Sequence, residues 1–515
     1  MKKSVTIILV FVLFTGFILT LNQYFGFLEN INWGSKWVFV PNFLNLIFSF
    51  TIVATIFLII FERGKPSKTI AWILVLVLFP LIGMLLYLYF GRNYRKNKIF
   101  SRKGLADFER IDLLSKNQIE DLSGQHFNNS KIFGKINIIK LLLNNSKALL
   151  TENNEVEILN NGEATFDSIL DELRNARDHI HLEYYRFRND KIGRKIKRIL
   201  IQKAQQGVQV RVIYDKVGSW SLDRRFLRGL RKRGVEIVAF MPIRFPFFAN
   251  KVNYRNHRKI IVVDGKIGFV GGINIADKYV EGDPELGFWR DTHLKIVGDA
   301  VHSLQAIFLT DWYFSSEKIV QGDQFFPKHD VAIKSLVQIT ASGPDSDWAS
   351  IMQAYFSAIT TADHYIYIST PYFMPNESIL TAIKTAALSG VDVKIVLPGR
   401  SDLFLYDWSS NSYIEELLEA GVNIYVYRKG FTHSKLLMVD GIFCSVGTAN
   451  MDVRSFDQNF EVNALVYDTN ITTQLEKLFM EDIENSEKII LDNFQRRPFI
   501  KKLQESIGRI FTPLL

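Results

Sequence analysis

A duplicated motif constrains the fold of this chain more than any other feature. Each copy reads His-x-Lys-x4-Asp and is followed, six residues later, by a turn of small residues that ends in Asn. The first copy consists of His257, Lys259, Asp264 and Asn274, and the second of His433, Lys435, Asp440 and Asn450. One copy alone would occur by chance in many proteins. Two copies with matching tails indicate two half-sites that close around one anionic group.

The sequence around the two copies is repeated as well. Gly207 and Gly390 each follow a helical segment and precede an alternating strand rich in Val and Ile, at 208–213 and 391–396. A helix followed by Gly and such a strand is typical of a βαβ unit. We therefore expect an α/β fold with two half-domains, 150–330 and 331–515, related by a pseudo-twofold axis. Each half should be a mixed, mostly parallel sheet with helices on its faces.

The repeated residues suit chemistry on a phosphodiester. Residues i and i+2 of a strand share one face, so the His and Lys of each copy project together. Two Lys and two Asn would hold the phosphate and neutralise its oxygens as negative charge develops. One imidazole can attack phosphorus, and the other can give its proton to the leaving alkoxide, since the reference pKa of histidine is about 6.5. The sequence does not decide which histidine attacks.

Four carboxylates complete the candidate site. Asp264 and Asp440 belong to the motifs, but each precedes Gly, so we expect them at turns in a structural role. Asp291 lies 34 residues after His257 and Glu461 lies 28 residues after the second motif histidine. Both open an apolar alternating strand, and we expect them to accept the Nδ1 protons of the motif histidines. The alternative is that they are solvated acids at strand edges.

No metal and no cofactor is expected. The sequence contains one cysteine, Cys444, so neither an intrachain disulfide nor a cysteine-based metal site can form. The seven histidines outside the motifs, such as His179 and His181, follow no paired pattern. We interpret them as ordinary core or surface residues.

The first 92 residues are predicted to form a membrane region. Segments 4–21, 37–61 and 69–90 carry no charge, and about 20 apolar residues are enough to cross a bilayer. A basic cluster at 92–103 favours a cytoplasmic carboxyl-terminal portion, although Lys2 and Lys3 point the other way if all three segments span. Residues 93–149 are typical of a helical connector. The formal charge of +9 suits an anionic partner, and the membrane segments favour phospholipid over nucleic acid.

One segment of the first half has no equal in the second. Residues 240–248 combine aromatic side chains with an arginine. This composition fits an interfacial membrane loop, and it fits equally well a loop that packs against the neighbouring half.

The doubled motif resembles that of the phospholipase D superfamily over about residues 150–515. The amino-terminal segment resembles the membrane hairpin of bacterial cardiolipin synthases. The residues that carry this second likeness are Glu62-Arg63, Pro66, Thr69, Ala71-Trp72, Pro80, Gly83 and Tyr89-Phe90-Gly91-Arg92-Asn93. Similar stretches further along are Glu183-Tyr184-Tyr185, Thr370-Pro371-Tyr372-Phe373 and Asn450-Met451-Asp452-x-Arg454-Ser455.

The resemblance implies a bacterial cell-membrane enzyme with two phospholipase D-like halves. It would transfer a phosphatidyl group from one phosphatidylglycerol to another, giving cardiolipin and glycerol. By analogy, His257 would form the phosphatidyl-histidine intermediate, and His433 would protonate the leaving glycerol. The family's usual Gly-Ser is Gly271-Gly272 in one copy and Gly447-Thr448 in the other, which puts a hydroxyl contact to phosphate in doubt in the first half. A membrane-anchored phospholipase D that releases phosphatidic acid is the alternative, and the oligomeric state is not predicted.

Overall fold

The structure is a computed structural model that describes residues 52–61, 66–79, 83–84, 87, 113–120, 133–240, 254–400 and 404–512. The chain divides into two compact units. One comprises Met1–Asn97 with Arg244–Asn253, and the other comprises Lys98–Ile243 with Tyr254–Leu515. The second unit contains both copies of the motif.

The smaller unit is described in part. It contains a helix at 52–61 and the helix α3 (Pro66–Leu78). Within the described ranges, each helix lacks the length or the apolar character that a membrane span requires. The predicted span 4–21 lies outside the described residues, as do most of the 37–61 span, part of the 69–90 span and residues 241–248 of the aromatic segment. The membrane region therefore stays a prediction.

The first half is built on a seven-stranded sheet. Its strand order is β2 (Asn154–Asn160), β9 (Thr292–Gly298), β7 (Ile267–Gly271), β6 (Lys259–Val263), β3 (His179–Tyr184), β4 (Gln209–Asp215) and β5 (Glu236–Phe240). Its helices are α7 (Asn161–Asn175), α8 (Lys191–Gln205), α9 (Arg224–Arg231), α10 (Lys278–Glu281) and α11 (Ala300–Ser316).

The second half repeats this order in a nine-stranded sheet. The matching strands are β10 (Leu336–Ser342), β19 (Glu461–Tyr467), β17 (Phe443–Gly447), β16 (Leu436–Val439), β11 (Tyr365–Ser369), β13 (Asp392–Pro398) and β14 (Asn423–Tyr427). Edge strands β1 (Leu150–Thr151) and β20 (Ser486–Lys488) are added at the two ends. Its helices are α6 (Ile136–Asn145), α12 (Ser350–Thr360), α13 (Glu377–Leu388), α14 (Phe404–Asn411), α15 (Ile414–Glu419), α16 (Val453–Asp457), α17 (Thr469–Glu484), α18 (Leu491–Gln495) and α19 (Phe499–Phe511). Edge strand β1 thus joins the second sheet, although it opens the range expected for the first half.

The expectation of mostly parallel sheets is wrong. Parallel pairing is confined to β3–β4–β5 in the first sheet and β11–β13–β14 in the second, and the other pairs of both sheets are antiparallel. The βαβ units that prompted the expectation are present, but the motif strands are joined by tight turns instead. Asp264 and Gly265 both have positive φ (53° and 65°), which is the type I′ geometry that connects antiparallel strands.

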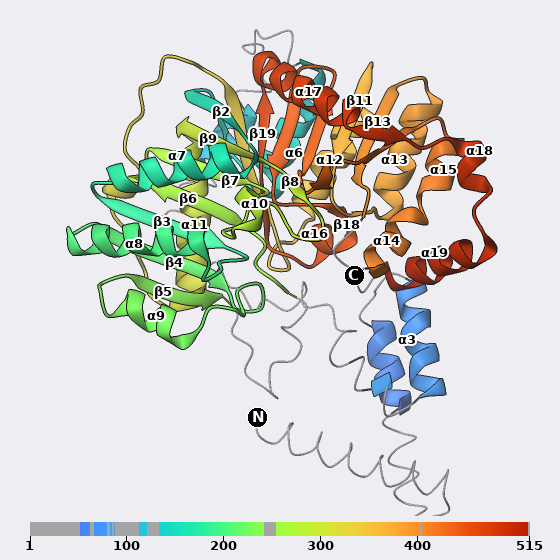
Figure 1. Cartoon of the computed structure of the whole chain (residues 1–515), viewed down its shortest axis with the longest axis horizontal. Helices are drawn as coiled ribbons and strands as arrows, with labels where there is room; N and C mark the ends of the chain where they lie inside the picture. Colours follow the sequence, from blue (N-terminus) through green and yellow to red (C-terminus); the bar gives the residue numbers. More distant parts are fainter. Residues whose placement is uncertain are drawn as a thin grey trace, which may run out of the picture. The chain divides into compact units, whose positions relative to one another are not determined.

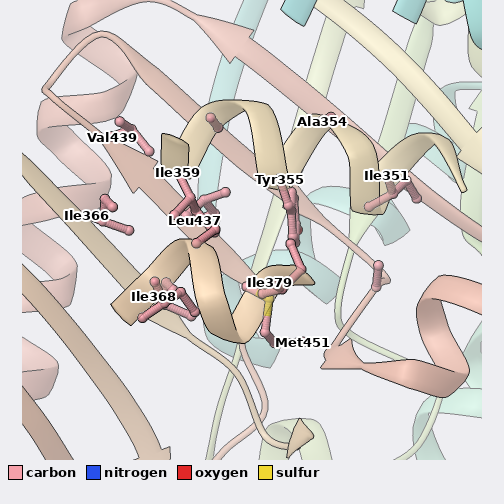
Figure 2. Close-up of a cluster of buried hydrophobic side chains, with 14 of the residues drawn as sticks. Ile351, Ala354, Tyr355, Ile359, Ile366, Ile368, Ile379, Leu437, Val439 and Met451 are labelled. Atoms are coloured by element: carbon pink, nitrogen blue, oxygen red, sulfur yellow. The ribbon is translucent and has the colours of Figure 1, made fainter. Parts of the chain in front are cut away.

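The two sheets share one core, into which α11 and α17 also pack, and their outer faces carry α7 and α8 in the first half and α12 and α13 in the second (Figure 1). Side chains alternate along β6, so that Ile261 and Val263 pack against α7, α8 and α9, while Ile260 and Val262 enter a cluster with residues of the second sheet. Helices α12 and α13 cover the outer face of the second sheet, where Tyr355 and Ile379 lie over Ile368 and Leu437 (Figure 2). Because the inner faces are packed together, the motif strands of both halves end near each other.

Candidate active site

The two motif histidines lie where backbone from one half pairs with backbone from the other. His257 lies two residues before β6, and its N–H donates to the carbonyl of Phe460 at 2.9 Å. The N–H of His433 donates to the carbonyl of Arg290 at 2.7 Å. This second junction is extended by parallel pairing of β8 (Phe288–Arg290) with β15 (Gly430–Thr432). The two junctions are equivalent under the pseudo-twofold relation.

Each histidine is bound by a carboxylate from the opposite half. The residue after Phe460 is Glu461, whose Oε2 lies 2.9 Å from Nδ1 of His257. The residue after Arg290 is Asp291, whose Oδ2 lies 2.7 Å from Nδ1 of His433. Both carboxylates are fully buried. The sequence singled out these two acids but gave no sign that each one crosses between halves, and as a result neither half holds a complete site.

The motif lysines are buried beside their own histidines. Lys259 Nζ donates to the carbonyl of His257 at 2.6 Å, and Lys435 Nζ donates to the carbonyl of His433. Burial lowers the pKa of Lys259 to about 7, Glu461 opposes this effect, and the charge of Lys435 adds to it. The two ammonium groups therefore influence each other within one site, and a bound anion would relieve their repulsion.

Burial and positive neighbours keep both imidazoles neutral. The pKa of His257 is lowered to about 4, first by burial and then by Lys259 and Lys435, against the pull of Glu461. Burial also lowers the pKa of His433 well below its ordinary value, aided by Lys435, Lys278, Lys259 and His257. Since His257 contributes to the lowered pKa of His433, the two rings are close enough to interact electrostatically. A phosphate between them would favour the protonated form of one ring.

The two carboxylates differ in their proton affinity. Burial raises the pKa of Asp291 to about 6, although Lys435 and Arg290 act in the opposite direction. Burial acts on Glu461 in the same sense, but its pKa is lowered overall because His257 and Lys259 outweigh burial. Glu461 therefore stays ionised beside His257, whereas Asp291 takes up a proton more readily beside His433.

The motif asparagines lie at the ends of the second motif strands. Asn274 accepts the N–H of Arg186 at 3.1 Å and donates to the hydroxyl of Tyr279 at 2.7 Å. Asn450 donates to Asp452 at 3.2 Å, and its buried Oδ1 has no hydrogen-bond partner among the residues that the structure describes. Each amide nitrogen has two N–H groups, so each can still donate one of them to a phosphate oxygen.

The difference between Gly272 and Thr448 follows from the two carboxylates. A Cβ at Gly272 would lie 2.1 Å from Oδ1 of Asp291, so the carboxylate occupies the place of a side chain. In the second half, the Thr448 hydroxyl instead accepts the N–H of Val462 at 2.9 Å. The hydroxyl that the first copy lacks is thus tied to the backbone in the second.

The motif aspartates lie at the opposite ends of β6 and β16 from the histidines. Asp264 accepts the backbone N–H groups of residues 177, 178 and 179. Asp440 accepts those of residues 363, 364 and 365, and it also pairs with Lys135 at 3.2 Å. Asp264 thus holds the loop that leads into β3, and Asp440 holds the loop that leads into β11, so both have a positioning role.

Aromatic side chains around the histidines were not predicted from the spacing of the motifs. The Tyr185 ring meets His257 edge-on at 4.9 Å, and Tyr279 and Trp289 lie 5.7 and 5.6 Å from the His433 ring. Trp289 is two residues before Asp291, and Tyr279 is five residues after Asn274. Their closeness to the motif residues in the sequence was thus the signal that could have indicated these aromatic side chains.

One group of potential metal ligands occurs within the described ranges, beside the turn of the first motif. Asp299, His302 and His329 each bring one ligand atom within 4.8 Å of the others. Each of these residues already has a protein partner. His329 contacts Asp299 and the carbonyl of Gly265, both at 3.1 Å, and His302 donates to the carbonyl of Pro327 at 2.8 Å. The group is therefore interpreted as a hydrogen-bonded cluster.

Comparison with known proteins matches this architecture to a family model described as "Cardiolipin synthase, PLD-like domain". The match covers residues 169–312 and 355–483, one segment in each half. The chain belongs to the cardiolipin synthase family. A second model, the phospholipase D-nuclease N-terminal region, matches residues 50–92.

Similar proteins in this family span nearly the whole chain. A cardiolipin synthase of Geobacillus sp. (strain WCH70) is 46% identical over 498 residues, covering 95% of this chain and 97% of its own. One from Geobacillus thermodenitrificans is 43% identical and covers both chains completely, and the major cardiolipin synthase of Bacillus subtilis is 41% identical, covering 92% and 98%.

The fold is also similar to a solved structure. The crystal structure of phosphatidylserine synthase from Haemophilus influenzae covers 75% of this chain and 99% of its own, with a TM-score of 0.56 and 16% identity. This likeness supports the two-half architecture.

Proposed function

We propose that this member of the family joins two phosphatidylglycerol molecules, transferring the phosphatidyl group of one to the other and releasing glycerol. The observation that carries the proposal is the crossing of the carboxylates. Glu461 and Asp291 each bind the histidine of the opposite half, which supports a single site that both His/Lys pairs share. The family's named activity agrees with this arrangement.

In the first step, Nε2 of His257 attacks phosphorus, and the bond from phosphorus to the glycerol oxygen breaks. His433, protonated while the anion is bound, gives its proton to the leaving glycerol oxygen. In the second step, His433 takes the proton from a hydroxyl of the second phosphatidylglycerol. That oxygen attacks phosphorus, the bond to His257 breaks, and cardiolipin forms with both histidines restored.

The electrostatics favour His257 as the nucleophile. An ionised Glu461 keeps the proton of His257 on Nδ1, which leaves a lone pair on Nε2. Lys259, Lys435, Asn274 and Asn450 would hold the phosphate oxygens as charge develops on them. The burial of the site limits the access of water, which favours a lipid alcohol as the second acceptor.

The proposal places the enzyme in the bacterial cell membrane, with several spans before the catalytic unit and that unit on the cytoplasmic side. The apolar amino-terminal segments support the location. A protease added to intact cells should leave the catalytic unit uncut and should cut it after lysis. Cleavage in intact cells would place the site outside.

The function is tested with purified full-length protein and phosphatidylglycerol vesicles, with the lipids analysed by mass spectrometry. Cardiolipin and glycerol are the expected products, and phosphatidic acid alone would mean a hydrolase. His257→Ala and His433→Ala should each lose on the order of 10³-fold or more in turnover while still inserting into membranes. Near-normal activity in either variant would refute the shared site. A chelator should leave turnover unchanged, because the proposed steps need no metal.

A further inference from the structure

The carboxyl-terminal helix α19 exposes the apolar face that a soluble helix would bury. Phe499, Leu503, Ile507 and Ile510 recur at intervals of four, four and three residues, which forms one stripe along a helix. All four are exposed, up to 79% for Phe499 and 75% for Ile510, and Ile500 beside them is exposed as well. An ordered stripe of this size on a helix marks an interaction surface.

The inward face of α19 is polar or small, so the orientation of the helix is fixed by specific contacts. Glu505 is 7% exposed and accepts two hydrogen bonds from Arg497, at 3.1 and 2.8 Å. Gly508 packs directly on α14, where its carbonyl accepts the Ser409 hydroxyl at 2.6 Å and an added Cβ would collide with the Ser409 backbone. Rotating the helix to bury its apolar stripe would break these contacts.

The charge of this segment matches an anionic surface. Residues 496–512 contain five basic side chains and one acid. Arg497 pairs with that acid, the buried Glu505, and Arg509 pairs with Glu416 of α15. The other three basic side chains are Arg496, Lys501 and Lys502. Lys501 is exposed at the amino-terminal turn of the helix, and Arg496 is exposed just before it. An apolar stripe with basic side chains beside it is the composition of helices that lie in the interface of anionic bilayers.

The stripe is close to the active site along a short chain of contacts. α19 packs on α14, and Ser410 of α14 accepts the N–H of Phe373 at 3.1 Å. Phe373 begins β12 (Phe373–Met374), which pairs with β18 (Met451–Asp452) directly after Asn450. Figure 1 shows α14 between α19 and the region of β18 and α16. A surface that seats α19 would therefore lie beside the phosphate-binding end of the second half.

We propose that the stripe of α19 inserts into the interface of an anionic phospholipid bilayer and holds the mouth of the active site at that surface. The inference rests on the proposed function, because it explains how a buried site meets a lipid substrate. The occupant is lipid and not an apolar protein surface, because the basic side chains beside the stripe would have no anionic counterpart on such a protein.

A local probe tests the proposal independently of turnover. Cys444 is buried, so a cysteine placed on the full-length chain by Ile510→Cys can carry the single accessible label. In vesicles containing phosphatidylglycerol, the fluorescence of a polarity-sensitive label should shift to the blue and should be quenched by lipids that carry a quencher in the acyl chain. Glu484→Cys, exposed at the end of α17, is the matched control and should do neither.

Other occupants of the stripe give different results, and each would overturn the proposal. A label covered by another segment of the chain would be shielded from the acyl chains and would not be quenched by lipid. A label covered by a second copy would respond to protein concentration and would cross-link between chains. Quenching without any cardiolipin formed would refute the proposed function and leave the docking surface standing.

A kinetic measurement adds a second readout. The triple variant Leu503→Ser, Ile507→Ser and Ile510→Ser should require about tenfold more vesicle lipid for half-maximal activity, with the same turnover on substrate dispersed in detergent micelles. The conservative control Ser506→Thr, beside the stripe, should require the same vesicle lipid concentration as the parent protein. An unchanged lipid requirement in the triple variant would contradict the proposal.

Discussion

At the scale of single residues, the two halves differ most in the carboxylates that hold their histidines. Asp291 has a pKa raised to about 6 by burial, and it must be ionised to accept the proton on Nδ1 of His433. Lys259 has a pKa lowered to about 7 by burial, and it must be charged to hold phosphate. The pKa values of these two groups therefore set the lower and upper limits of the pH range in which the free enzyme is active.

We predict a bell-shaped dependence of kcat/KM on pH, with an acid limb near 6 and a basic limb near 7. On the acid side, protonation of Asp291 should change activity and stability in opposite directions, so a loss of chemistry can be told apart from unfolding. Because the pKa of Asp291 is higher in the folded chain than the value of about 3.9 expected when unfolded, protonation of Asp291 favours the fold. Its contribution to stability should thus grow as pH falls from about 6 towards about 4, while activity declines.

The Asp291→Asn variant is the control for this assignment. The asparagine does not titrate, so the acid limb should disappear and turnover should be low throughout the range. An acid limb that stays near 6 in this variant would assign the titration to another group. Activity is measured in mixed micelles and unfolding in parallel by fluorescence, so that both curves refer to the same samples.

Gly272 offers a second test at this scale. In Gly272→Ala, the new Cβ would lie 2.1 Å from Oδ1 of Asp291, so the carboxylate must move away from His433. We expect a loss of about 100-fold in turnover, comparable to the loss of an orienting group elsewhere. Gly134→Ala is the control, since a Cβ there meets no atom of the described residues within 4 Å. Equal activity in both variants would mean that the position of Asp291 does not matter.

At the scale of elements, the motif aspartates fix the loops that lead into β3 and β11. Asp264 and Asp440 each accept hydrogen bonds from three successive backbone N–H groups, so their role is structural and not chemical. The two differ in one respect, because Asp440 also balances the buried ammonium of Lys135. Removing the carboxylate charge should therefore lower the free energy of unfolding by different amounts at Asp264 and at Asp440.

We predict that Asp264→Asn lowers stability by roughly 1–3 kcal/mol through weakened hydrogen bonds. Asp440→Asn should cost more, roughly 3–5 kcal/mol, because Lys135 would be left as an uncompensated buried charge. Denaturant unfolding in detergent measures both. The double variant Asp440→Asn with Lys135→Met should recover part of the loss. Equal costs in the two single variants would contradict the role given to Lys135.

Element identity was largely predictable from the sequence, while strand direction and pairing were not. The repeat at Gly207 and Gly390 correctly predicted the parallel units β3–β4–β5 and β11–β13–β14. It could not reveal that most neighbouring strands run antiparallel, although the Asp264-Gly265 turn carried that signal. The exchange of Glu461 and Asp291 between halves depends on tertiary packing of the sheets, which local patterns do not encode.

At the scale of the whole molecule, one chain supplies every group of the candidate site. The backbone junctions from His257 to Phe460 and from His433 to Arg290 both close within the chain. The shared core between the two sheets holds these junctions in register. A single chain should therefore be sufficient for activity, whatever its oligomeric state.

We predict that mixing or co-expressing His257→Ala and His433→Ala restores no activity, because each chain lacks one histidine of its own site. Cardiolipin formation in the mixture, compared with each variant alone, measures this directly. Recovered activity would require a site assembled from two chains, with a half of one seated on the opposite half of the other. Such an exchange would have to break the core that Ile260 and Val262 share with the second sheet, a cost that the continuous packing of that core makes prohibitive.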